Sequence, residues 1–285
     1  MGHTPTSDDY DVDHSKVLGR GRFSTVRLAY CRRQQRHVAA KIIPISRDND
    51  VTIANVSREF AILSELDHAN IIDVYDHFLD GDFAWITMER AQNGDLRKFV
   101  HLRRRLSEKL ARKFFAQILD GVAYMHSRNI VHRDIKCDNI LVTGNEEIVK
   151  ICDMGCAVIV KEHEEDLIPP RQSDQPHGPS ERFYGSPSYA APEVLDRVVY
   201  DFKPADVWSA GVMLFFMVSG YLPFGCDDVG RIRARMNSSL RWPRPIKQIS
   251  RHCRDYTSAL LQLRPSDRLT AEGALHEIWL DKKTL

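Results

Sequence analysis

The spacing of hydrophobic and polar positions divides the chain into two unlike parts. Residues 15–43 alternate around Gly19 and Gly21 and are rich in Val and Leu, which predicts a β-hairpin. Further strands are predicted at residues 38–43, 71–78 and 83–88. A helical spacing joins Val56, Phe60 and Leu63. The first 90 residues therefore predict a small sheet with one helix, preceded by a flexible polar tail over residues 1–14.

Helical periodicity dominates after Gly94. Ser107 is placed to cap a helix whose apolar positions recur at steps of three and four: Leu110, Phe114, Ile118, Val122 and Met125. The most apolar run covers residues 207–224, with Asp206 expected at its start. Serine, glycine and proline interrupt that run, so it predicts a buried core helix and not a membrane span. Residues 161–182 combine acidic residues with prolines and show no period, which predicts a long mobile loop.

Size and composition limit the classes of function and partner that the chain can have. A chain of 285 residues can form two lobes around a substantial core, and its formal net charge of +1 gives no general reason to expect nucleic acid or a membrane as partner. The basic runs at residues 103–105 and 231–235 are interpreted as solvated helix faces. The six cysteines lack metal-site spacing and are interpreted as reduced thiols of a cytoplasmic protein, which we expect to be a monomer.

One short run carries the side chains that a phosphoryl transfer needs: His132-Arg133-Asp134-Ile135-Lys136-Cys137-Asp138-Asn139. Asp134 can accept a hydroxyl proton, Lys136 can neutralise the migrating group, and Asn139 can hold a magnesium ion. Asp153, followed by Met154 and Gly155, offers a carboxylate for the same metal. Several such strings in the right order are very unlikely by chance.

Two weaker signals lie upstream. Gly19 and Gly21 could let backbone amides approach phosphates, but a plain hairpin turn explains the same string equally well. Lys41 ends an apolar strand, and Glu59 follows on the predicted helix. The two could form an ion pair that holds the ammonium against the nucleotide phosphates, or they could be unrelated surface charges. The downstream motifs favour the pair.

These motifs together resemble the catalytic domain of eukaryotic protein kinases over residues 15–283. Three strings are also similar to the testis-specific serine/threonine kinases of the calmodulin-dependent kinase group: residues 68–75, 136–141 and 185–193. The resemblance implies an α+β fold of two lobes, with a small β-rich N-lobe holding one helix (residues 15–90) and a larger helical C-lobe (residues 91–285). MgATP would bind between the lobes, and the activation segment would run from residue 153 to residue 193.

The resemblance also implies a role for individual residues. The nucleotide set would comprise Leu18, Gly19, Gly21, Val26, Ala39, Lys41, Met88, Glu89, Ala91, Asp95, Leu141 and Asp153. Within it, Met88 would be the gatekeeper, and the Glu89 carbonyl and Ala91 amide would bind the adenine edge. Asp95 would reach the ribose or a basic substrate residue. The catalytic set would comprise Asp134, Lys136, Lys41 and Glu59, with Asn139 and Asp153 as the Mg²⁺ ligands.

Structural roles follow from the same resemblance. Glu193 would pair with Arg268 inside the C-lobe. An apolar column through both lobes would contain Leu63, Val74, His132 and Met154.

The chain departs from the kinase pattern at two single residues and in the activation segment. Met154 stands where phenylalanine is usual and Ser24 where a third glycine is usual, but neither change removes a charged catalytic group. In the activation segment, Arg182 occupies the position of the usual phosphorylated threonine. We expect either Glu181 to supply the negative charge to Arg133, or Ser180 or Ser186 to be phosphorylated. We also expect Ser186 to bond to Asp134 and Lys136.

The sequence thus predicts an enzyme that transfers the γ-phosphoryl group of MgATP to a serine or threonine hydroxyl of a protein. Asp95 and Asp138 stand where related kinases contact arginines upstream of the target hydroxyl, so the resemblance implies a preference for basic substrates. The alternatives are a pseudokinase scaffold that binds nucleotide or partners without transfer, and a kinase of small molecules. The intact charged residues and the Ala191-Pro192-Glu193 element argue against them.

Overall fold

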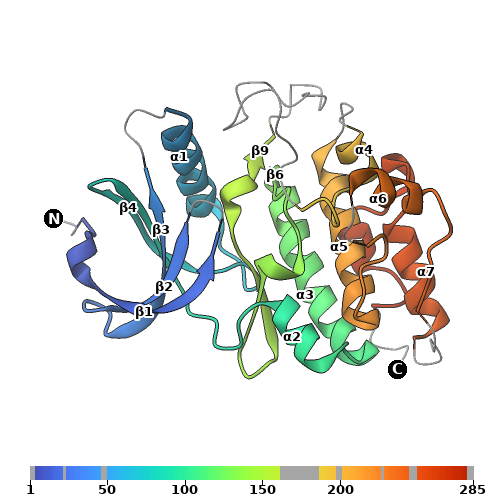
Figure 1. The fold of residues 1–285 in the computed structure, drawn as a ribbon, viewed down its shortest axis with the longest axis horizontal. Helices are drawn as coiled ribbons and strands as arrows, with labels where there is room; N and C mark the ends of the chain where they lie inside the picture. The colour runs from blue at the N-terminus through green and yellow to red at the C-terminus, as the bar shows by residue number, and fades with distance from the viewer. Residues whose placement is uncertain are drawn as a thin grey trace.

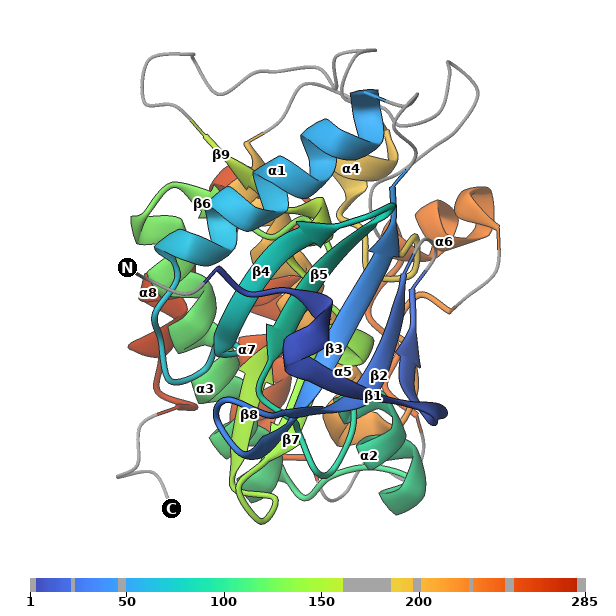
Figure 2. The same cartoon turned by 90° about the vertical axis from the view of Figure 1, so that its left-hand side faces the viewer.

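A small antiparallel sheet forms one end of the computed structural model, which describes residues 4–21, 24–45, 50–160, 186–196, 201–225, 228–243 and 249–280. Its strands are β1 (Tyr10–Arg20), β2 (Thr25–Cys31), β3 (Arg36–Pro44), β4 (Val74–Asp80) and β5 (Phe83–Met88). They lie in the order β1-β2-β3-β5-β4 (Figures 1 and 2). The predicted hairpin and strands are confirmed, although β4 begins at Val74 and not at residue 71.

The two faces of this sheet are covered by different structures. Helix α1 (Asp50–Glu65) lies across one face, where the ring of Phe60 packs 4.6 Å from the ring of His77 (Figure 2). On the opposite face, Phe78 stacks with both Tyr10 and Trp85, with ring centroids 6.0 and 5.8 Å apart. The sheet therefore has a small aromatic core of its own beyond the one it shares with α1.

Tyr10 corrects the prediction of a flexible tail that reaches residue 14. Tyr10 is the first residue of β1, and its side chain is buried. Its hydroxyl donates a hydrogen bond to Asp76 and lies 3.1 Å from Oγ1 of Thr87. The short helix η1 (Ser7–Asp9) precedes it. The polar residues around Tyr10 mask this signal in the sequence, yet one buried aromatic side chain with partners for its hydroxyl is enough to anchor the strand.

The other end of the molecule is mainly helical (Figure 1). Its helices are α2 (Leu96–Arg103), α3 (Glu108–Ser127), α4 (Pro192–Leu195), α5 (Phe202–Ser219), α6 (Val229–Met236), α7 (Arg251–Leu260) and α8 (Ala271–Leu275). Two short antiparallel pairs join β6 (Ile130–Val131) to β9 (Val158–Ile159) and β7 (Ile140–Thr143) to β8 (Ile148–Ile151). Single turns of 3₁₀ helix are η2 (Cys137–Asn139), η3 (Met154–Cys156) and η5 (Pro265–Asp267).

Local signals explain where two of these helices begin and end. Ser107 caps α3 by accepting a hydrogen bond from the Leu110 amide, as predicted. Helix α5 ends at Gly220, whose φ of 80° is left-handed, and a Cβ there would lie 2.2 Å from the carbonyl oxygen of Arg104. A glycine is therefore required at this contact between α5 and the end of α2.

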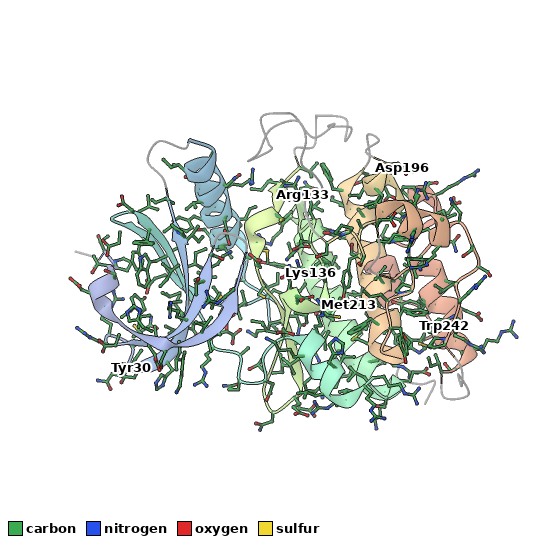
Figure 3. All side chains as sticks on the ribbon, viewed as in Figure 1. Tyr30, Arg133, Lys136, Asp196, Met213 and Trp242 are labelled. Atoms are coloured by element: carbon green, nitrogen blue, oxygen red, sulfur yellow. The ribbon has the colours of Figure 1, made fainter. Side chains whose placement is uncertain are left out.

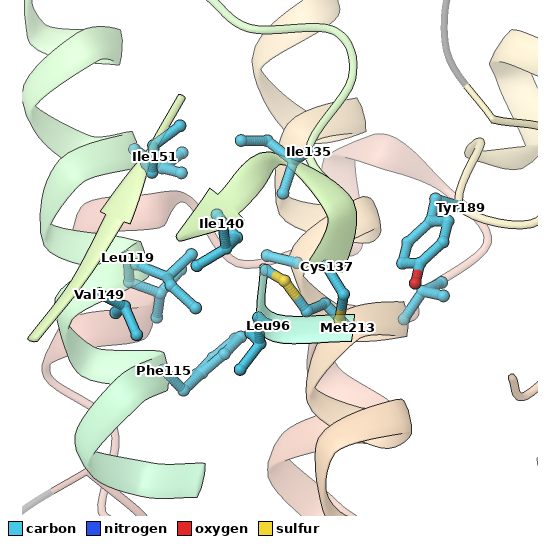
Figure 4. Close-up of a cluster of buried hydrophobic side chains, with 14 of the residues drawn as sticks. Leu96, Phe115, Leu119, Ile135, Cys137, Ile140, Val149, Ile151, Tyr189 and Met213 are labelled. Carbon is cyan, nitrogen blue, oxygen red and sulfur yellow. The ribbon is translucent and has the colours of Figure 1, made fainter. Parts of the chain in front are cut away.

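Helix α5 forms the centre of the C-lobe core. All its residues from Asp206 to Ser219 except Ser209 are buried. Figure 4 shows Met213 of this helix in one buried cluster with Leu96 and Cys137. Among the described helices, none combines the length and hydropathy that crossing a bilayer requires.

The predicted start of α5 at Asp206 is wrong. The helix begins at Phe202, where the side chain of Asp201 accepts a hydrogen bond from the Lys203 amide at 2.9 Å. Pro204 is tolerated because it lies in the first helical turn. Asp206 is instead buried inside the helix and has a different role, described below. The α+β fold of two lobes is confirmed.

Candidate active site

The loop that follows β6 is held in place by Asp206. This carboxylate accepts the backbone N–H groups of His132 and Arg133, each at 2.9 Å, and lies 3.1 Å from Nε2 of His126. Arg133 has a left-handed φ of 64°, which is unfavourable for a residue with a side chain. A buried carboxylate that accepts two amides thus fixes a strained backbone at the head of the predicted catalytic loop.

His132 links this loop to the next strand. Its buried ring accepts the Asp134 amide at Nδ1 (3.2 Å), so Nε2 carries the proton and donates to the carbonyl of Cys152 at 3.1 Å. Asp153 follows directly. One imidazole therefore positions both aspartates that the sequence singles out.

Asp134 lies with Lys136 and Asn139 in one cluster, as predicted. Its Oδ2 accepts hydrogen bonds from Nζ of Lys136 (2.5 Å) and Nδ2 of Asn139 (3.0 Å), and Asn139 also donates to the Asp134 carbonyl at 2.9 Å. Its Oδ1 is buried and has no hydrogen-bond partner. The expected bond from Ser186 is thus not formed at Oδ1, and Lys136 and Asn139 take up Oδ2. A buried carboxylate oxygen without a donor can still accept a hydrogen bond from a group that enters the site. Figure 3 places Lys136 and Arg133 on the side of the C-lobe that faces the sheet.

Lys41 joins the two lobes. Its Nζ lies 2.7 Å from Oε1 of Glu59 and 2.7 Å from Oδ1 of Asp153, so the predicted ion pair with Glu59 is present. Burial alone lowers the pKa of Lys41, but the two carboxylates outweigh burial and raise the pKa above its ordinary value. The Lys41 ammonium in turn lowers the pKa of Asp153 from 3.8 to about 2. Both groups are therefore charged at neutral pH.

The oxygen donors near Lys41 fit a magnesium ion. The Asp153 side chain is 46% exposed, although one of its oxygens contacts Lys41, and its backbone has a left-handed φ of 65°. Asn139 uses its amide nitrogen toward Asp134, which leaves the amide oxygen as an acceptor. Among the described residues, no three His, Cys, Asp or Glu side chains gather as a metal cluster. One carboxylate and one amide oxygen suit Mg²⁺, which keeps water and phosphate oxygens as its remaining ligands.

The predicted apolar nucleotide residues come from both lobes, with Leu141 on β7 and the others on strands of the five-stranded sheet. Ala39 of β3 pairs in register with Met88 of β5, and both are buried. Val26 and Leu141 are partly buried and pack against the core, whereas Leu18 is 40% exposed. These five residues are the apolar part of the predicted nucleotide set.

The glycine-rich turn joins β1 to β2. Gly19 pairs with Val26, and the Gly21 amide donates to the Ser24 carbonyl at 2.9 Å. A Cβ on Gly21 would lie 2.7 Å from Oγ of Ser24, so a larger residue here would force the Ser24 side chain to move. Residues 22 and 23 lie outside the described residues.

The protein kinase domain family matches residues 12–280 of this chain. The chain belongs to the protein kinase family. It is 33% identical over 275 residues to the serine/threonine-protein kinase kin-29 of Caenorhabditis elegans, and the matched region covers 95% of this chain and 31% of that kinase. It is 34% identical over 271 residues to the serine/threonine-protein kinase SIK1 of Rattus norvegicus, and the matched region covers 95% of this chain and 32% of that kinase.

A third relative is a calcium/calmodulin-dependent protein kinase with a similar degree of sequence identity. Calcium/calmodulin-dependent protein kinase type II of Caenorhabditis elegans is 32% identical over 281 residues, covering 97% of this chain and 37% of the relative. The chain spans about a third of the length of these relatives. The kinase resemblance read from the motifs is confirmed at the level of the family and of its serine/threonine relatives.

Glu89, in the segment between β5 and α2 that we call the hinge, belongs to a charge cluster that the sequence did not reveal. Nζ of Lys150 lies 2.5 Å from Oε1 of Glu89 and 3.2 Å from Oδ2 of Asp73, and the Glu89 amide donates to the Asp73 carbonyl at 2.9 Å. We call Asp73, Glu89 and Lys150 the hinge clamp. Its only signal in the sequence is a lysine inside the apolar strand β8. The predicted roles of the Glu89 carbonyl and the Ala91 amide at adenine stay predictions.

Asp95 is engaged within the kinase fold itself. Its side chain caps α2 by accepting the Lys98 amide at 2.8 Å, and its Oδ2 lies 2.9 Å from Nζ of Lys98. Only 17% of the Asp95 side chain is exposed. Its predicted contact with ribose or a basic substrate residue stays a prediction, since the carboxylate already has two partners.

The described ends of the activation segment are tied to the C-lobe. Arg133 donates from Nε to the Cys156 carbonyl at 2.7 Å, and its guanidinium lies 5.6 Å from the ring centroid of Phe202. The predicted pair of Glu193 and Arg268 is present, with Nη1 and Oε1 separated by 2.8 Å. The candidate charge sites Ser180, Glu181 and Arg182 lie outside the described residues.

Two further predictions concern side chains around the kinase site. Burial raises the pKa of the Cys152 thiol far above its usual range and that of Cys156 to about 11, so both are protonated at neutral pH. Within the basic runs, Arg103 pairs with Glu146 and Arg233 with Asp196. The run at residues 231–235 lies on α6, as predicted, but α2 ends at Arg103, so Arg104 and Arg105 do not belong to a helix face.

Proposed function

We propose that this domain transfers the γ-phosphoryl group of MgATP to a serine or threonine hydroxyl of a protein. The observation that carries the proposal is the buried, unpartnered Oδ1 of Asp134, adjacent to the oxygen held by Lys136 and Asn139. An acceptor hydroxyl that donates to Oδ1 would be aligned and lose its proton there. The serine/threonine kinases among the relatives support the same activity.

Each charged residue has a distinct part in this proposal. Bound MgATP supplies the phosphoryl group, with the metal neutralising charge on the phosphate oxygens. Lys136, 2.5 Å from Asp134, would stabilise the negative charge that develops between donor and acceptor oxygens. Lys41 would hold the phosphates, because Glu59 and Asp153 fix its ammonium from two sides. Asn139 and Asp153 would hold the metal.

Nucleotide recognition is proposed for the apolar set described above. Leu18, Val26, Ala39 and Leu141 would enclose the adenine, with Met88 as gatekeeper. Gly19 and Gly21 would bring backbone amides to the phosphates.

The regulatory and cellular parts of the proposal rest on the sequence. Glu181 would supply a charge to Arg133, and the alternative is phosphorylation of Ser180 or Ser186. Unchanged transfer by Glu181→Ala would contradict the first idea, and mass spectrometry would identify the second. The testis-specific subfamily, a cytoplasmic location and a monomeric state stay predictions. Arginine upstream of the acceptor is also a prediction, refined in the next section.

A radiolabelled transfer assay with MgATP and serine peptides tests the proposed activity. The variants Asp134→Asn and Lys41→Met should lose transfer, whereas Lys109→Met, an exposed lysine on α3, should match the wild type. Equal transfer by wild type and Asp134→Asn would contradict the proposed role of Oδ1. Nucleotide binding without transfer, even after treatment with an upstream kinase, would favour a pseudokinase.

A further inference from the structure

The first turn of α2 presents two cations to two carboxylates beside the proposed reaction centre. Nη1 of Arg97 lies 3.2 Å from Oδ1 of Asp138, and Nζ of Lys98 lies 2.9 Å from Oδ2 of Asp95. Asp95 and Asp138 are the two carboxylates that were expected to bind a substrate arginine. In this structure, cations of the domain itself already occupy them. The four charges cancel, so this surface has no net negative charge.

Asp138 adjoins the reaction centre. It belongs to η2 together with Asn139, whose side chain binds Asp134 directly. An extended peptide with its hydroxyl at Asp134 places residues two or three positions away at about 7–11 Å, within reach of a long side chain. A basic residue of the substrate would therefore meet Asp138 at the edge of the site.

Arg97 lies on the same edge. The charge of Asp138 raises the pKa of Arg97, with smaller contributions from Tyr189 and Cys137. Tyr189 belongs to the segment that leads into α4, and burial together with the neighbouring Cys137 of η2 raises the pKa of its hydroxyl. Arg97 is thus close both to the catalytic loop and to the described end of the activation segment.

We propose that Arg97, supported by Lys98, acts as a built-in competitor that occupies the acidic subsite and weakens the preference for substrates with upstream arginine. This inference rests on the proposed function and names a specificity residue for it. A substrate arginine would have to displace Arg97 from Asp138 before it could bind there. Asp95 is less available still, because its carboxylate also caps α2.

The exposure of the pair sets the size of the effect. The side chains of Arg97 and Asp138 are 53% and 38% exposed, so water and salt screen their attraction. Arg97 is therefore displaceable and does not block the subsite. Its removal should change selectivity about two- to fivefold, which is the scale of one partly exposed ion pair.

Peptide binding tests the inference without requiring transfer. Two labelled serine peptides would differ only by arginine or glutamine at the positions two and three residues before the serine. Fluorescence anisotropy at low ionic strength would give the ratio of their Kd values. The wild type should favour the arginine peptide only slightly, and Arg97→Leu should increase that preference about two- to fivefold. Arg97→Gln should do the same and serves as a second variant should leucine impair folding.

Arg103→Leu is the matched control. Arg103 lies on the same helix and is also in an ion pair, but its partner is Glu146 in the turn between β7 and β8. It should leave the wild-type ratio unchanged. The double variant Arg97→Leu/Asp138→Asn should lose the gain, because the carboxylate that Arg97 covers is then absent.

The outcomes separate this inference from the proposed function. A wild type that already prefers the arginine peptide as strongly as Arg97→Leu would overturn the inference, and so would a gain that persists in the double variant. If the predicted binding ratios appear but no radiolabel is transferred, the inference stands and the proposed activity fails. If transfer occurs and the ratios do not respond to Arg97, the reverse holds.

Discussion

Two buried ion pairs in this domain have similar partners but differ in how completely they are enclosed. Arg268 donates to both oxygens of Glu193 and to the carbonyls of Gln262 and Pro204, and its side chain is 0% exposed. Lys41 also pairs with a buried glutamate, Glu59, but shares its ammonium with the half-exposed Asp153. The C-lobe pair is closed, and the pair between the lobes keeps one carboxylate facing solvent.

That difference suggests a rule for separating structural from functional charges in this molecule. A closed pair leaves no charged group for a ligand, since every donor already has an acceptor. An open pair keeps a charged oxygen that a metal or a substrate can still use. The open pair should therefore matter more for transfer, and the closed pair more for stability.

The largest expected effect comes from opening the closed pair. Arg268→Met would leave the Glu193 carboxylate buried without its cation, and the free energy of unfolding should fall by about 3–5 kcal/mol. Chemical denaturation would measure the loss. Adding Glu193→Leu should recover part of it, because the second change removes the stranded charge. A loss below about 1 kcal/mol would show that the enclosure is not what makes the pair stabilising.

Asp153→Asn tests the open pair. Transfer of phosphate should fall about 100- to 1000-fold, because the ionised oxygen meant for the metal is gone. The unfolding free energy should change by less than about 1 kcal/mol, because Lys41 keeps Glu59 as its partner. A radiometric assay and a denaturation curve on the same sample give both numbers. A large loss of stability with normal transfer would reverse the distinction drawn here.

Lys150→Met tests a pair of intermediate character. The Lys150 and Glu89 side chains are 10% and 18% exposed, whereas that of Asp73 is 53% exposed. Loss of the ammonium should cost about 1–2 kcal/mol of unfolding free energy, the scale of a charged hydrogen bond. Lys150→Arg, which keeps the charge, is the matched control. KM for ATP should rise in the methionine variant, because Lys150 holds Glu89 and the proposed adenine contacts begin at Glu89. An unchanged KM would mean that the hinge clamp only stabilises the fold.

The smallest effect is a dependence on pH. Lys41 lowers the pKa of Asp153 from 3.8 to about 2, so ionised Asp153 stabilises the folded state above about pH 4. That contribution should shrink as the pH falls from about 4 through 2 and disappear below pH 2, where the carboxylate is protonated in both states. The wild type and Asp153→Asn should accordingly differ by a fraction of a kcal/mol above pH 4 and converge below pH 2. A gap that widens on acidification would contradict the sign.

Short-range signals account for what the sequence predicted well. Alternation and helical spacing identified the N-lobe strands and α1, and Ser107 identified the start of α3. The cluster of Asp134, Lys136 and Asn139 was predictable because its members lie within six residues. The pair of Lys41 and Glu59 was predicted only with the help of the downstream motifs, since strand and helix bring the two residues together across 18 positions.

Long-range contacts explain what the sequence left out. Tyr10 could not be recognised as an anchor, because its partners Asp76 and Thr87 lie on β4 and β5. Lys150 looked like an ordinary charged residue until the fold brought Asp73 and Glu89 to it. The ion pair of Arg97 with Asp138 could not be predicted either, because sequence spacing does not show that the first turn of α2 lies beside Asp138.

Asp206 links the most buried helix of the C-lobe directly to the backbone of the catalytic loop. Opening the loop amides of His132 and Arg133 to solvent would require the carboxylate to leave both, at the centre of a packed core. Their hydrogen exchange should accordingly follow cooperative unfolding of α5 and not local loop motion. By this measure the catalytic loop should belong to the slowest-exchanging unit of the domain, although it is irregular backbone between β6 and η2.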